Sequence, residues 1–503
     1  MVSATETASA VLEKGGNGTE TDVKIIKNYV NGAFVQSNSE NILDIIDPSN
    51  GKQLAKLPLS TKSEFDDAVE SAKNAFPAWR RTPPVERARY FFKLKTIMED
   101  RFDDIARVLT LENGKTFDEA RGSVRRAVEN VEVAAGIPTM MQGSSLEDVA
   151  SGIDTVVYRR PIGVFAAITP FNFPAMVPLW FLPYAVATGN TFILKPSEQV
   201  PMTSNFIFEL IDEVGFPPGV VNLVHGDKVV VDGICTHPDI KGVSFVGSSP
   251  VAQHVYTLAS KNGKRVQALG GAKNFVVVSD DADINLAAEA IIASCFGCSG
   301  ERCLAASVLL GDEKIYDELK DLVVQKASNI KIGGGFDEGV LMGPVVSARH
   351  KERVLSYIEK GIEEGADMIL DGREAQVDGK EGGYYLRPTI FENVKPSMTI
   401  AKEEIFGPVL SMMKVKDLDD AIEIISEHPL ANTISIFTTS GKNARKFRYN
   451  VDASMIGINI GVPAPMSFFT FGGAKGSFFG DLKAHGKDSI EFYTDKKVVI
   501  SRW

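Results

Sequence analysis

The feature that most constrains the fold is an alternation of short β-rich stretches and longer helical patterns between residues 163 and 280. The short stretches read GVFAAIT, TFILK, VVNLV, GVSFVG and NFVVVS, and one helical pattern between them, MTSNFIFELIDEVG, ends at Gly215. Strands that alternate with helices in this way form a parallel sheet with helices on both faces. The sequence therefore predicts an α/β fold with a doubly wound sheet.

Candidate ligand-binding residues lie at or just after the ends of the first two stretches. Thr169, Phe171 and Asn172 follow GVFAAIT, and Lys195 and Glu198 follow TFIL. A doubly wound sheet binds ligands at the carboxyl ends of its strands. Glu198 can accept hydrogen bonds from an adenosine ribose and would repel a 2′-phosphate, which favours NAD over NADP, although Lys195 beside it weakens that preference. The dinucleotide-binding motif G-x-G-x-x-G does not occur in the chain. The alternative interpretation is a sheet whose loops carry ordinary polar residues with no role in binding.

Two helix starts can be located. Thr61 and Glu64 match a capping box, and apolar residues then recur at helical spacing until Pro77, where we expect the helix to stop. After GVSFV, Ser248 is expected to cap the next helix, with Pro250 in its first turn. A helix start offers free N–H groups and a positive dipole end, so the second of these is a candidate phosphate site.

Length and composition exclude several classes of function. A chain of 503 residues predicts two or three lobes. A net charge of -11 and a pI near 5.3, with no block of Lys and Arg, argue against nucleic acid and anionic membranes as partners. No run of about 18 apolar residues predicts a membrane span. Residues 1–21 are small, polar and acidic, and are expected to be a mobile tail rather than a signal peptide.

The stretch CFGCSGERC, residues 295–303, holds three of the four cysteines. Free thiols in so long a chain indicate a reducing compartment, the cytoplasm. The spacing suggests a metal, but only one further thiol remains and the six histidines include no H-E-x-x-H, so no metal site is expected. Cys295 falls on an apolar helix face and Cys298 in a turn. Cys303 follows Arg302, whose guanidinium favours a thiolate, so Cys303 is either a nucleophile or a third structural thiol.

Nearly the whole chain resembles a known family. PFNFP, LKPSE, FVGSS, a Gly-Gly stretch before residue 275, SGERCLA and EEIFGPV occur in the order and with the separations of the aldehyde dehydrogenase superfamily. The resemblance implies that Cys303 adds to an aldehyde and becomes an enzyme thioester. Asn172 would join the Cys303 backbone N–H in stabilising the oxyanion.

Gly114-Lys115-Thr116, which looks like the end of a phosphate-binding loop, is expected to be a loop between helices.

The same resemblance implies a set of cofactor contacts for NAD. Glu404 would hold the nicotinamide ribose, and Phe406 would pack near the ring. The remaining positions that match the family's cofactor contacts are Thr169, Phe171, Lys195, Glu198, Gln199, Ser248 and Gly270.

One departure from the family pattern indicates the branch. Hydrolytic members carry E-L-G-G, whose glutamate activates water, whereas this chain has Ala268 in that position. General-base assistance is typically worth about 10²–10⁴-fold, so without it a thiol such as coenzyme A can intercept the acyl group. The stretch LGGAKN and the C-terminal FFGDLKAHGKDSIEFYTDKKVVISRW are similar to the CoA-acylating methylmalonate semialdehyde dehydrogenases. The alternative is a dehydrogenase that hydrolyses its thioester.

Substrates of that branch carry a carboxylate, and the resemblance implies two arginines that bind it. Arg302 is one, and the family pattern G-x-V-x-R places the other at Arg126. Its neighbour Arg125 is the second choice; if Arg126 binds the carboxylate, Arg125 is expected on a solvated helix face. Methylmalonate semialdehyde would give propionyl-CoA, and malonate semialdehyde would give acetyl-CoA, each with loss of CO2.

Two residues depart from the branch and are expected near the site. Glu301 stands where glutamine is usual, and Phe275 where histidine is usual. Glu301 could alter the charge around Cys303 or replace the missing base, although a side chain that points away is the preferred interpretation. A non-catalytic metal-binding or structural relative is a third hypothesis, which metal content and thiol reactivity would test.

The implied architecture is the aldehyde dehydrogenase fold, assembled as a homotetramer or at least a dimer. The C-terminal IEFYTDKKVVIS, with Ile490, Phe492, Val498 and Ile500 alternating, is expected to be an edge strand that pairs with another subunit. The expected domains are an NAD-binding domain over 22–141 and 160–273, a catalytic domain over 274–470, and an oligomerisation element over 142–159 and 484–503.

Overall fold

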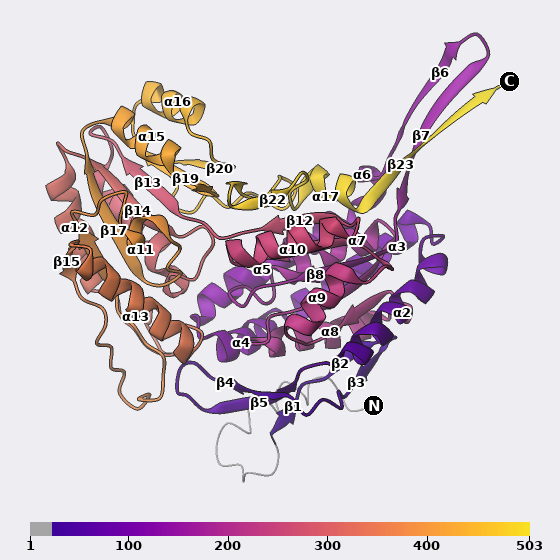
Figure 1. Ribbon diagram of the computed structural model, residues 1–503, viewed down its shortest axis with the longest axis horizontal. Coiled ribbons are helices and arrows are strands. Elements are labelled where there is room, and N and C mark those ends of the chain that lie inside the picture. Colours follow the sequence, from indigo (N-terminus) through magenta and orange to yellow (C-terminus); the bar gives the residue numbers. More distant parts are fainter. Residues whose placement is uncertain (1–22) are drawn as a thin grey trace.

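The computed structural model describes residues 23–503, so the tail expected over residues 1–21 lies outside the described residues. Two bodies, each built around a β-sheet, lie side by side, and a ribbon of three strands projects from one of them (Figure 1). Across the described part of the chain, no helix is long and apolar enough to cross a membrane. The fold is the α/β arrangement that the strand and helix alternation predicts.

The first body contains an eight-stranded sheet in the order β22-β12-β11-β8-β9-β10-β2-β3. Five strands, β12, β11, β8, β9 and β10, are parallel; β22 and β2 flank them in antiparallel orientation, and β3 pairs antiparallel with β2 at the edge. The first four predicted strands are confirmed here, whereas β12 was not predicted. The strands are β2 (Asn28–Val30), β3 (Ala33–Val35), β8 (Val164–Ile168), β9 (Thr191–Lys195), β10 (Val221–Leu223), β11 (Ile240–Val246), β12 (Arg265–Leu269) and β22 (Phe478–Gly480).

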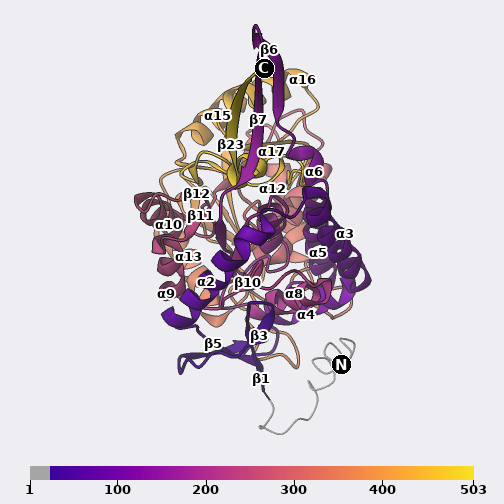
Figure 2. The same cartoon turned by 90° about the vertical axis from the view of Figure 1, so that its right-hand side faces the viewer.

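Helices cover both faces of this sheet (Figure 2). In β8, Val164, Ala166 and Ile168 point into one apolar cluster, and Phe165 and Ala167 into the other. A strand buried on both faces has this alternation without polar positions. Helices α2 (Lys62–Trp79), α9 (Lys228–Thr236) and α10 (Ser249–Lys261) cover one face, and α3 (Pro84–Asp100), α4 (Phe102–Asn113), α5 (Phe117–Ala135), α6 (Ile137–Met140), α7 (Leu182–Ala187) and α8 (Pro201–Val214) the other.

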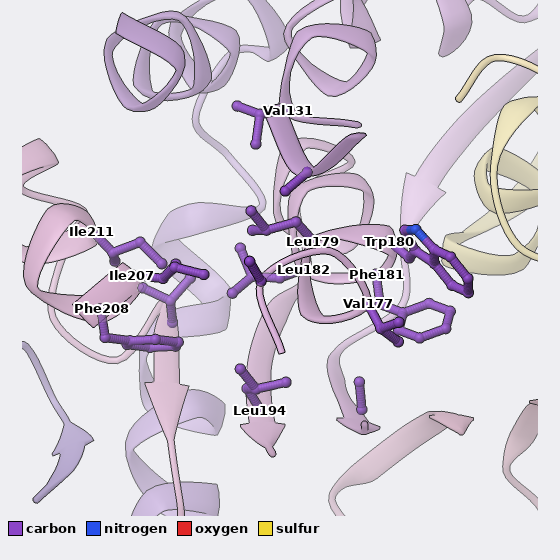
Figure 3. Close-up of a cluster of buried hydrophobic side chains, with 14 of the residues drawn as sticks. Val131, Val177, Leu179, Trp180, Phe181, Leu182, Leu194, Ile207, Phe208 and Ile211 are labelled. Carbon is purple, nitrogen blue, oxygen red and sulfur yellow. The ribbon is translucent and has the colours of Figure 1, made fainter. Parts of the chain in front are cut away.

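The larger of the two clusters lies between the sheet and the second group of helices. Figure 3 shows its centre, where Leu194 of β9 faces Leu182 of α7 and Phe208 of α8. Val131 of α5 packs onto the same cluster. This packing fixes the orientation of α5, which also carries candidate site residues.

The helix predictions were confirmed in part. The capping box of Thr61 and Glu64 is present at the start of α2, and α8 ends at Gly215 with φ +78°. The prediction that Pro77 ends the first helix is wrong, because α2 continues to Trp79, whose buried indole donates a hydrogen bond to the Val186 carbonyl at 2.9 Å. Ser248 stands at the N-cap of α10, but its side chain makes no capping hydrogen bond.

The second body contains a seven-stranded sheet in the order β15-β16-β17-β14-β13-β19-β20. Its first strand along the chain, β13 (Asn274–Val278), is the last of the five alternating stretches. The alternation by itself would continue the first sheet into this strand, which is wrong, whereas the expected catalytic domain begins at residue 274. Only residues 270–273 separate it from β12. Neighbouring parallel strands need a crossover of a dozen or more residues, so a connection this short cannot lead to a parallel neighbour of β12 in the same sheet.

The remaining elements of the second body alternate along the chain as in the first. The strands are β14 (Ala306–Asp312), β15 (Asp367–Leu370), β16 (Thr389–Glu392), β17 (Val409–Val415), β19 (Thr433–Phe437) and β20 (Met455–Ile458). The helices are α11 (Ile284–Phe296), α12 (Tyr316–Ser328), α13 (Ala348–Glu363), α14 (Thr399–Lys402), α15 (Leu418–Glu427) and α16 (Gly441–Asn450).

The projecting ribbon has the strand order β23-β7-β6 (Figure 1). Its strands are β6 (Ser144–Ala150), β7 (Ile153–Pro161) and β23 (Thr494–Arg502). Val498 and Ile500 are exposed on β23, but Ile490 and Phe492 belong to α17 (Gly486–Tyr493) and are buried, so the prediction of one continuous strand is wrong. Small sheets complete the fold: β1 (Lys24–Ile25), β4 (Ile42–Ile46) and β5 (Gln53–Pro58), and β18 (Leu430–Ala431) with β21 (Ala474–Lys475).

Candidate active site

Cys303 lies in the common wall of two cavities, one of about 630 Å³ and one of about 320 Å³. The turn before it has left-handed backbone at Cys298, Ser299 and Gly300. A Cβ atom on Gly300 would lie 2.2 Å from the Gly407 carbonyl oxygen, so only glycine fits there. This turn follows the end of α11 and leads into Cys303, which lies where the two cavities meet. Cys295 is buried on α11 as predicted, and the four cysteines are free.

The larger cavity collects the predicted cofactor residues. They come from the carboxyl ends of β8, β9 and β11, from the β12–β13 connection, and from the segment after α14. Asn172 and Cys303 also line this cavity. The predicted cofactor residues in its wall are Thr169, Phe171, Lys195, Glu198, Gln199, Ser248, Gly270, Glu404 and Phe406.

The chemistry of this wall fits a dinucleotide. Thr169 presents a buried Oγ1 atom that has no hydrogen-bond partner among the described residues. Lys195 Nζ lies 2.8 Å from Glu198 Oε2. Burial opposes ionisation of Glu198, but the Lys195 ammonium outweighs it and lowers the pKa of the carboxyl. An ionised Glu198 suits ribose hydroxyls and repels a 2′-phosphate.

Glu404 faces the Gly-Gly connection. Its Oε1 accepts a hydrogen bond from the Ala272 N–H at 2.9 Å, and a Cβ atom on Gly271 would lie 2.5 Å from its Oε2. Burial raises the pKa of Glu404 to about 7. Phe406, with φ +64°, packs edge-on against Phe171 at 5.7 Å between ring centroids.

Sequence reasoning missed three residues of the cofactor cavity on α13: Arg349, His350 and Arg353. Arg353 Nη2 donates to the Glu404 carbonyl at 3.0 Å, and His350 Nε2 lies 2.7 Å from the Phe406 carbonyl oxygen. Arg353 and His350 therefore hold the Glu404–Phe406 segment in place. The basic run RHKER was a signal, but nothing local connects it with EEIFGPV, more than fifty positions away.

The nucleophile loop is held by amides. Asn274 and Asn432 both donate to the Cys303 carbonyl, at 2.9 and 3.0 Å. Asn172 Nδ2 donates to the Glu301 carbonyl at 2.8 Å, which places its amide beside the loop. Burial and the charge of Glu404 together raise the pKa of the Cys303 thiol to about 12.

Lys115 was also missed as a site residue. The Gly114-Lys115-Thr116 segment is a loop between α4 and α5, as predicted. Its lysine is buried, lies 4.0 Å over the Phe173 ring, and donates from Nζ to the Asn172 carbonyl at 2.6 Å. The loop thereby supports the candidate oxyanion residue.

The smaller cavity holds both predicted arginines, Arg302 and Arg126. Arg302 is anchored on three sides: Nε donates to Cys298 Sγ at 3.2 Å, Nη1 to the Ala293 carbonyl at 3.0 Å, and Nη2 to Glu119 Oε1 at 3.3 Å. A guanidinium carries five N–H groups, so two remain for a ligand.

The two adjacent arginines of α5 have different surroundings. Arg126 lines the cavity and pairs with Glu129, with 3.0 Å between Nη1 and Oε2. Arg125 lies on the outer face, where Nη1 pairs with Glu99 Oε1 at 2.6 Å and about half of the side chain is exposed, as expected for a solvated helix face.

The three departures from the family lie in different places. Ala268 is fully buried in the apolar cluster under α10 and lines neither cavity. Phe275, expected near the site, instead packs in the core of the second sheet against His428. Glu301 points away from both cavities, accepts a hydrogen bond from the Val346 N–H at 3.1 Å, and has its pKa raised by burial to about 8. Among residues 23–503, no group of three or more potential ligands could hold a metal ion.

Comparison with known proteins agrees with this geometry. The chain is 51% identical over 484 residues to a malonate-semialdehyde dehydrogenase of Geobacillus kaustophilus strain HTA426, covering 96% of this chain and 100% of the relative. Among solved structures, a methylmalonate-semialdehyde dehydrogenase from Oceanimonas doudoroffii superposes with a TM-score of 0.94 at 42% identity, covering 96% and 99% of the two chains.

A Sinorhizobium meliloti 1021 protein, described as a methylmalonate-semialdehyde dehydrogenase and crystallised with NAD, superposes with a TM-score of 0.95 at 41% identity, covering 96% and 99% of the two chains. The model of the aldehyde dehydrogenase family matches residues 34–499. With a cysteine between a cavity that suits a dinucleotide and one with two arginines, the chain belongs to the aldehyde dehydrogenase family.

Proposed function

We propose that the protein oxidises malonate or methylmalonate semialdehyde with NAD, releases CO2, and transfers the acyl group to coenzyme A. The observation that carries the proposal is the position of Cys303 between two cavities with different linings. The larger cavity is lined by the nine residues expected to contact the cofactor, and the smaller one by Arg126 and Arg302, which supports the proposal. Names of the relatives support this substrate class.

The chemistry begins at the Cys303 sulfur. The thiol gives up its proton to water, and the thiolate attacks the aldehyde carbon to form a thiohemiacetal. Asn172 Nδ2 and the Cys303 N–H stabilise the developing oxyanion. NAD, when bound, accepts the hydride that leaves this carbon. The product on the enzyme is a thioester between Cys303 and the acyl group.

The arginines orient the decarboxylation. Arg302 and Arg126 hold the carboxylate, which leaves as CO2 while its bonding electron pair forms an enolate of the thioester. A proton then adds to the α carbon. The thiolate of coenzyme A attacks the carbonyl carbon, the bond to Cys303 breaks, and the thiol is regenerated. Overall, one semialdehyde, NAD⁺ and coenzyme A give one acyl-CoA, CO2 and NADH.

Transfer to coenzyme A is favoured because no base stands where hydrolytic relatives have one. Ala268 cannot activate water, and Glu301 points away from both cavities. Slow hydrolysis leaves time for attack by a thiol. The alternative function is a hydrolytic dehydrogenase for small acidic aldehydes.

We further infer a homotetramer, or at least a dimer, that assembles through the projecting ribbon, and a cytoplasmic location. Leu146, Val498 and Ile500 are each more than half exposed on that ribbon. Four free cysteines suit a reducing compartment. We also propose an NAD-binding domain over 22–141 and 160–273, a catalytic domain over 274–470, and an oligomerisation element over 142–159 and 484–503; the presence of two sheets and a separate ribbon supports this division.

The test is NADH release from each semialdehyde with and without coenzyme A, with identification of the acyl product. We expect steady turnover only with coenzyme A, and propionyl-CoA or acetyl-CoA as product. Equal turnover without coenzyme A, with free acid as product, would establish the hydrolytic alternative. Cys303→Ala should abolish both. Arg126→Ala should raise the KM for the acidic substrate, whereas the matched Arg125→Ala should not.

A further inference from the structure

His485 is a second unusual feature of the smaller cavity. It lies just before α17, lines the cavity together with Arg126 and Arg302, and is 3% exposed. Neither of its ring nitrogens has a hydrogen-bond partner among the described residues. A buried polar group without a partner is rare and calls for an explanation.

The apolar surroundings of His485 make it energetically unfavourable to bury its two ring nitrogens without hydrogen-bond partners. Its ring packs between the aromatic rings of Trp180, Phe471 and Tyr184, with centroids 5.0, 5.6 and 6.3 Å away. Burial lowers the pKa of His485 to about 3, so the ring is neutral and carries one N–H donor and one acceptor. A phenylalanine would satisfy this packing without the unpaired nitrogens.

The backbone of His485 is strained as well. It has φ +67° and ψ 174°, a region that glycine occupies far more readily than residues with a side chain. Such outliers cluster at functional sites, where the surrounding structure maintains them. Strain and an unpartnered polar ring at one position indicate that the side chain is kept for binding rather than for stability.

A second orphaned atom lies in the same wall. Ser123 of α5 is buried, and its Oγ atom has no hydrogen-bond partner among the described residues. It stands three positions before Arg126 and therefore on the same face of the helix. Ser123 and His485 thus line the same cavity of about 320 Å³ as the two arginines, together with Glu119, Asn130 and Ser467 among its polar residues.

We propose that His485 and Ser123 form a neutral hydrogen-bonding subsite that receives the carboxylate of the acidic aldehyde beside Arg126 and Arg302. The inference rests on the proposed function. A carboxylate offers about four acceptor positions, and it can accept hydrogen bonds from neutral donors as well as from the two guanidinium groups. The hydroxyl of Ser123 and the N–H of His485 take remaining positions and favour acidic over neutral aldehydes.

The test compares kcat/KM for malonate semialdehyde and for propanal, a neutral aldehyde of the same chain length, in the full enzyme with NAD and coenzyme A. His485→Phe keeps the aromatic packing and the backbone demand but removes both nitrogens. We expect kcat/KM for malonate semialdehyde to fall about tenfold or more, since hydrogen bonds to charged groups are the stronger ones, and kcat/KM for propanal to stay within about twofold. The melting temperature should stay the same or rise.

Two further variants keep the test decisive. Ser123→Ala, which fits any helix, should lower the acidic kcat/KM about threefold or more without affecting propanal. Ser489→Ala is the matched control, because Ser489 is also buried with an unpartnered Oγ, lies on α17 near His485, but does not line the cavity. It should change neither substrate. Binding of the unreactive dicarboxylate malonate, measured by calorimetry, should weaken in the first two variants only.

The outcomes separate this inference from the proposed function. If the wild-type enzyme does not prefer malonate semialdehyde to propanal, the proposed substrate class is wrong. If the wild type does prefer it and His485→Phe and Ser123→Ala keep the full preference, the subsite is wrong. An equal loss for both aldehydes in His485→Phe would show a packing role and would also overturn the proposal.

Discussion

The carboxylate of Glu404 acts electrostatically on Cys303, the proposed nucleophile. The pKa of Cys303 is raised to about 12 by burial and by Glu404, and the pKa of Glu404 itself is raised to about 7 by burial. Above pH 7, Glu404 is mostly ionised and opposes formation of the Cys303 thiolate. Below pH 7, Glu404 is mostly protonated and this opposition fades.

We therefore expect Glu404→Gln to speed alkylation of Cys303 by iodoacetamide severalfold at pH 8.5 and to have little effect at pH 6. Rates are measured on the enzyme without cofactor, and mass spectrometry of peptides assigns the label to Cys303. Glu403→Gln is the control, since Glu403 accepts a hydrogen bond from Tyr357 instead and should leave the rate unchanged. Equal acceleration at both pH values would show that the charge of Glu404 is not the cause.

Glu301 is a buried carboxyl whose ionisation at high pH lowers the stability of the fold. Its pKa is raised by burial from 4.5 to about 8. The folded state therefore binds a proton that the unfolded state releases between these values, and stability falls as pH rises from about 4.5 to 8.

Glu301→Gln retains an oxygen for the Val346 N–H and has no charge to bury. We expect it to match the wild type at pH 5 and to be more stable at pH 9 by on the order of 5 kcal/mol. Melting temperatures at pH 5, 7 and 9 provide the measurement. Glu363→Gln, an exposed position on α13, serves as the control and should not alter the pH profile. A wild-type profile that rises between pH 5 and 9 relative to Glu301→Gln would contradict the assignment.

At the scale of elements, two helices start with the same capping box but have different duties. Thr61 and Glu64 cap α2, and Thr116 and Glu119 cap α5. The carboxylate of Glu119 additionally accepts from the Cys298 N–H at 2.5 Å and from Arg302, so the start of α5 is tied to the nucleophile loop.

Thr61→Ala and Thr116→Ala should each cost about 1 kcal/mol of stability, the usual value of an N-cap. Only Thr116→Ala should also raise the KM for the acidic aldehyde, because α5 carries Ser123 and Arg126 and positions Arg302 through Glu119. Melting temperatures and steady-state kinetics of both variants test this. A similar rise in KM for Thr61→Ala would mean that the effect is general loosening of the fold.

The elements that could be predicted have local signals. Four strands of the first sheet, the cap of α2 and the glycine that ends α8 follow from periodicity and turn chemistry. The end of α2 did not, since the buried Trp79 and its bond to the Val186 carbonyl carry the helix past Pro77. Neither did β12, whose residues RVQAL include charged and polar side chains and no clear period.

For the whole molecule, the projecting ribbon is where assembly is proposed. Val498 and Ile500 alternate with Lys497 and Val499 along β23, and both are exposed in one chain. Replacing both apolar residues with lysine should halve the assembly or reduce it to monomers, because charged edges resist strand pairing. Light scattering after size-exclusion chromatography gives the mass. Lys497→Ala, on the other face of the strand, should leave the mass unchanged, and an unchanged mass for the double variant would place the interface elsewhere.

The sequence by itself determined the α/β class and brought out Cys303 as a candidate nucleophile. Nine of the residues that line the larger cavity were expected from the family resemblance, and seven of them lie at or just after the carboxyl ends of strands, where the order of the chain and the parallel sheet together dictate proximity.

Only the tertiary structure decided the rest. Arg125 and Arg126 are neighbours in sequence, and the rotation of α5 on its apolar cluster decides which one faces the cavity. His485 gave no local signal, because its burial among Trp180, Tyr184 and Phe471 arises from segments brought together by folding. Burial and pairing between distant segments are properties of the packed molecule, which local periodicity does not encode.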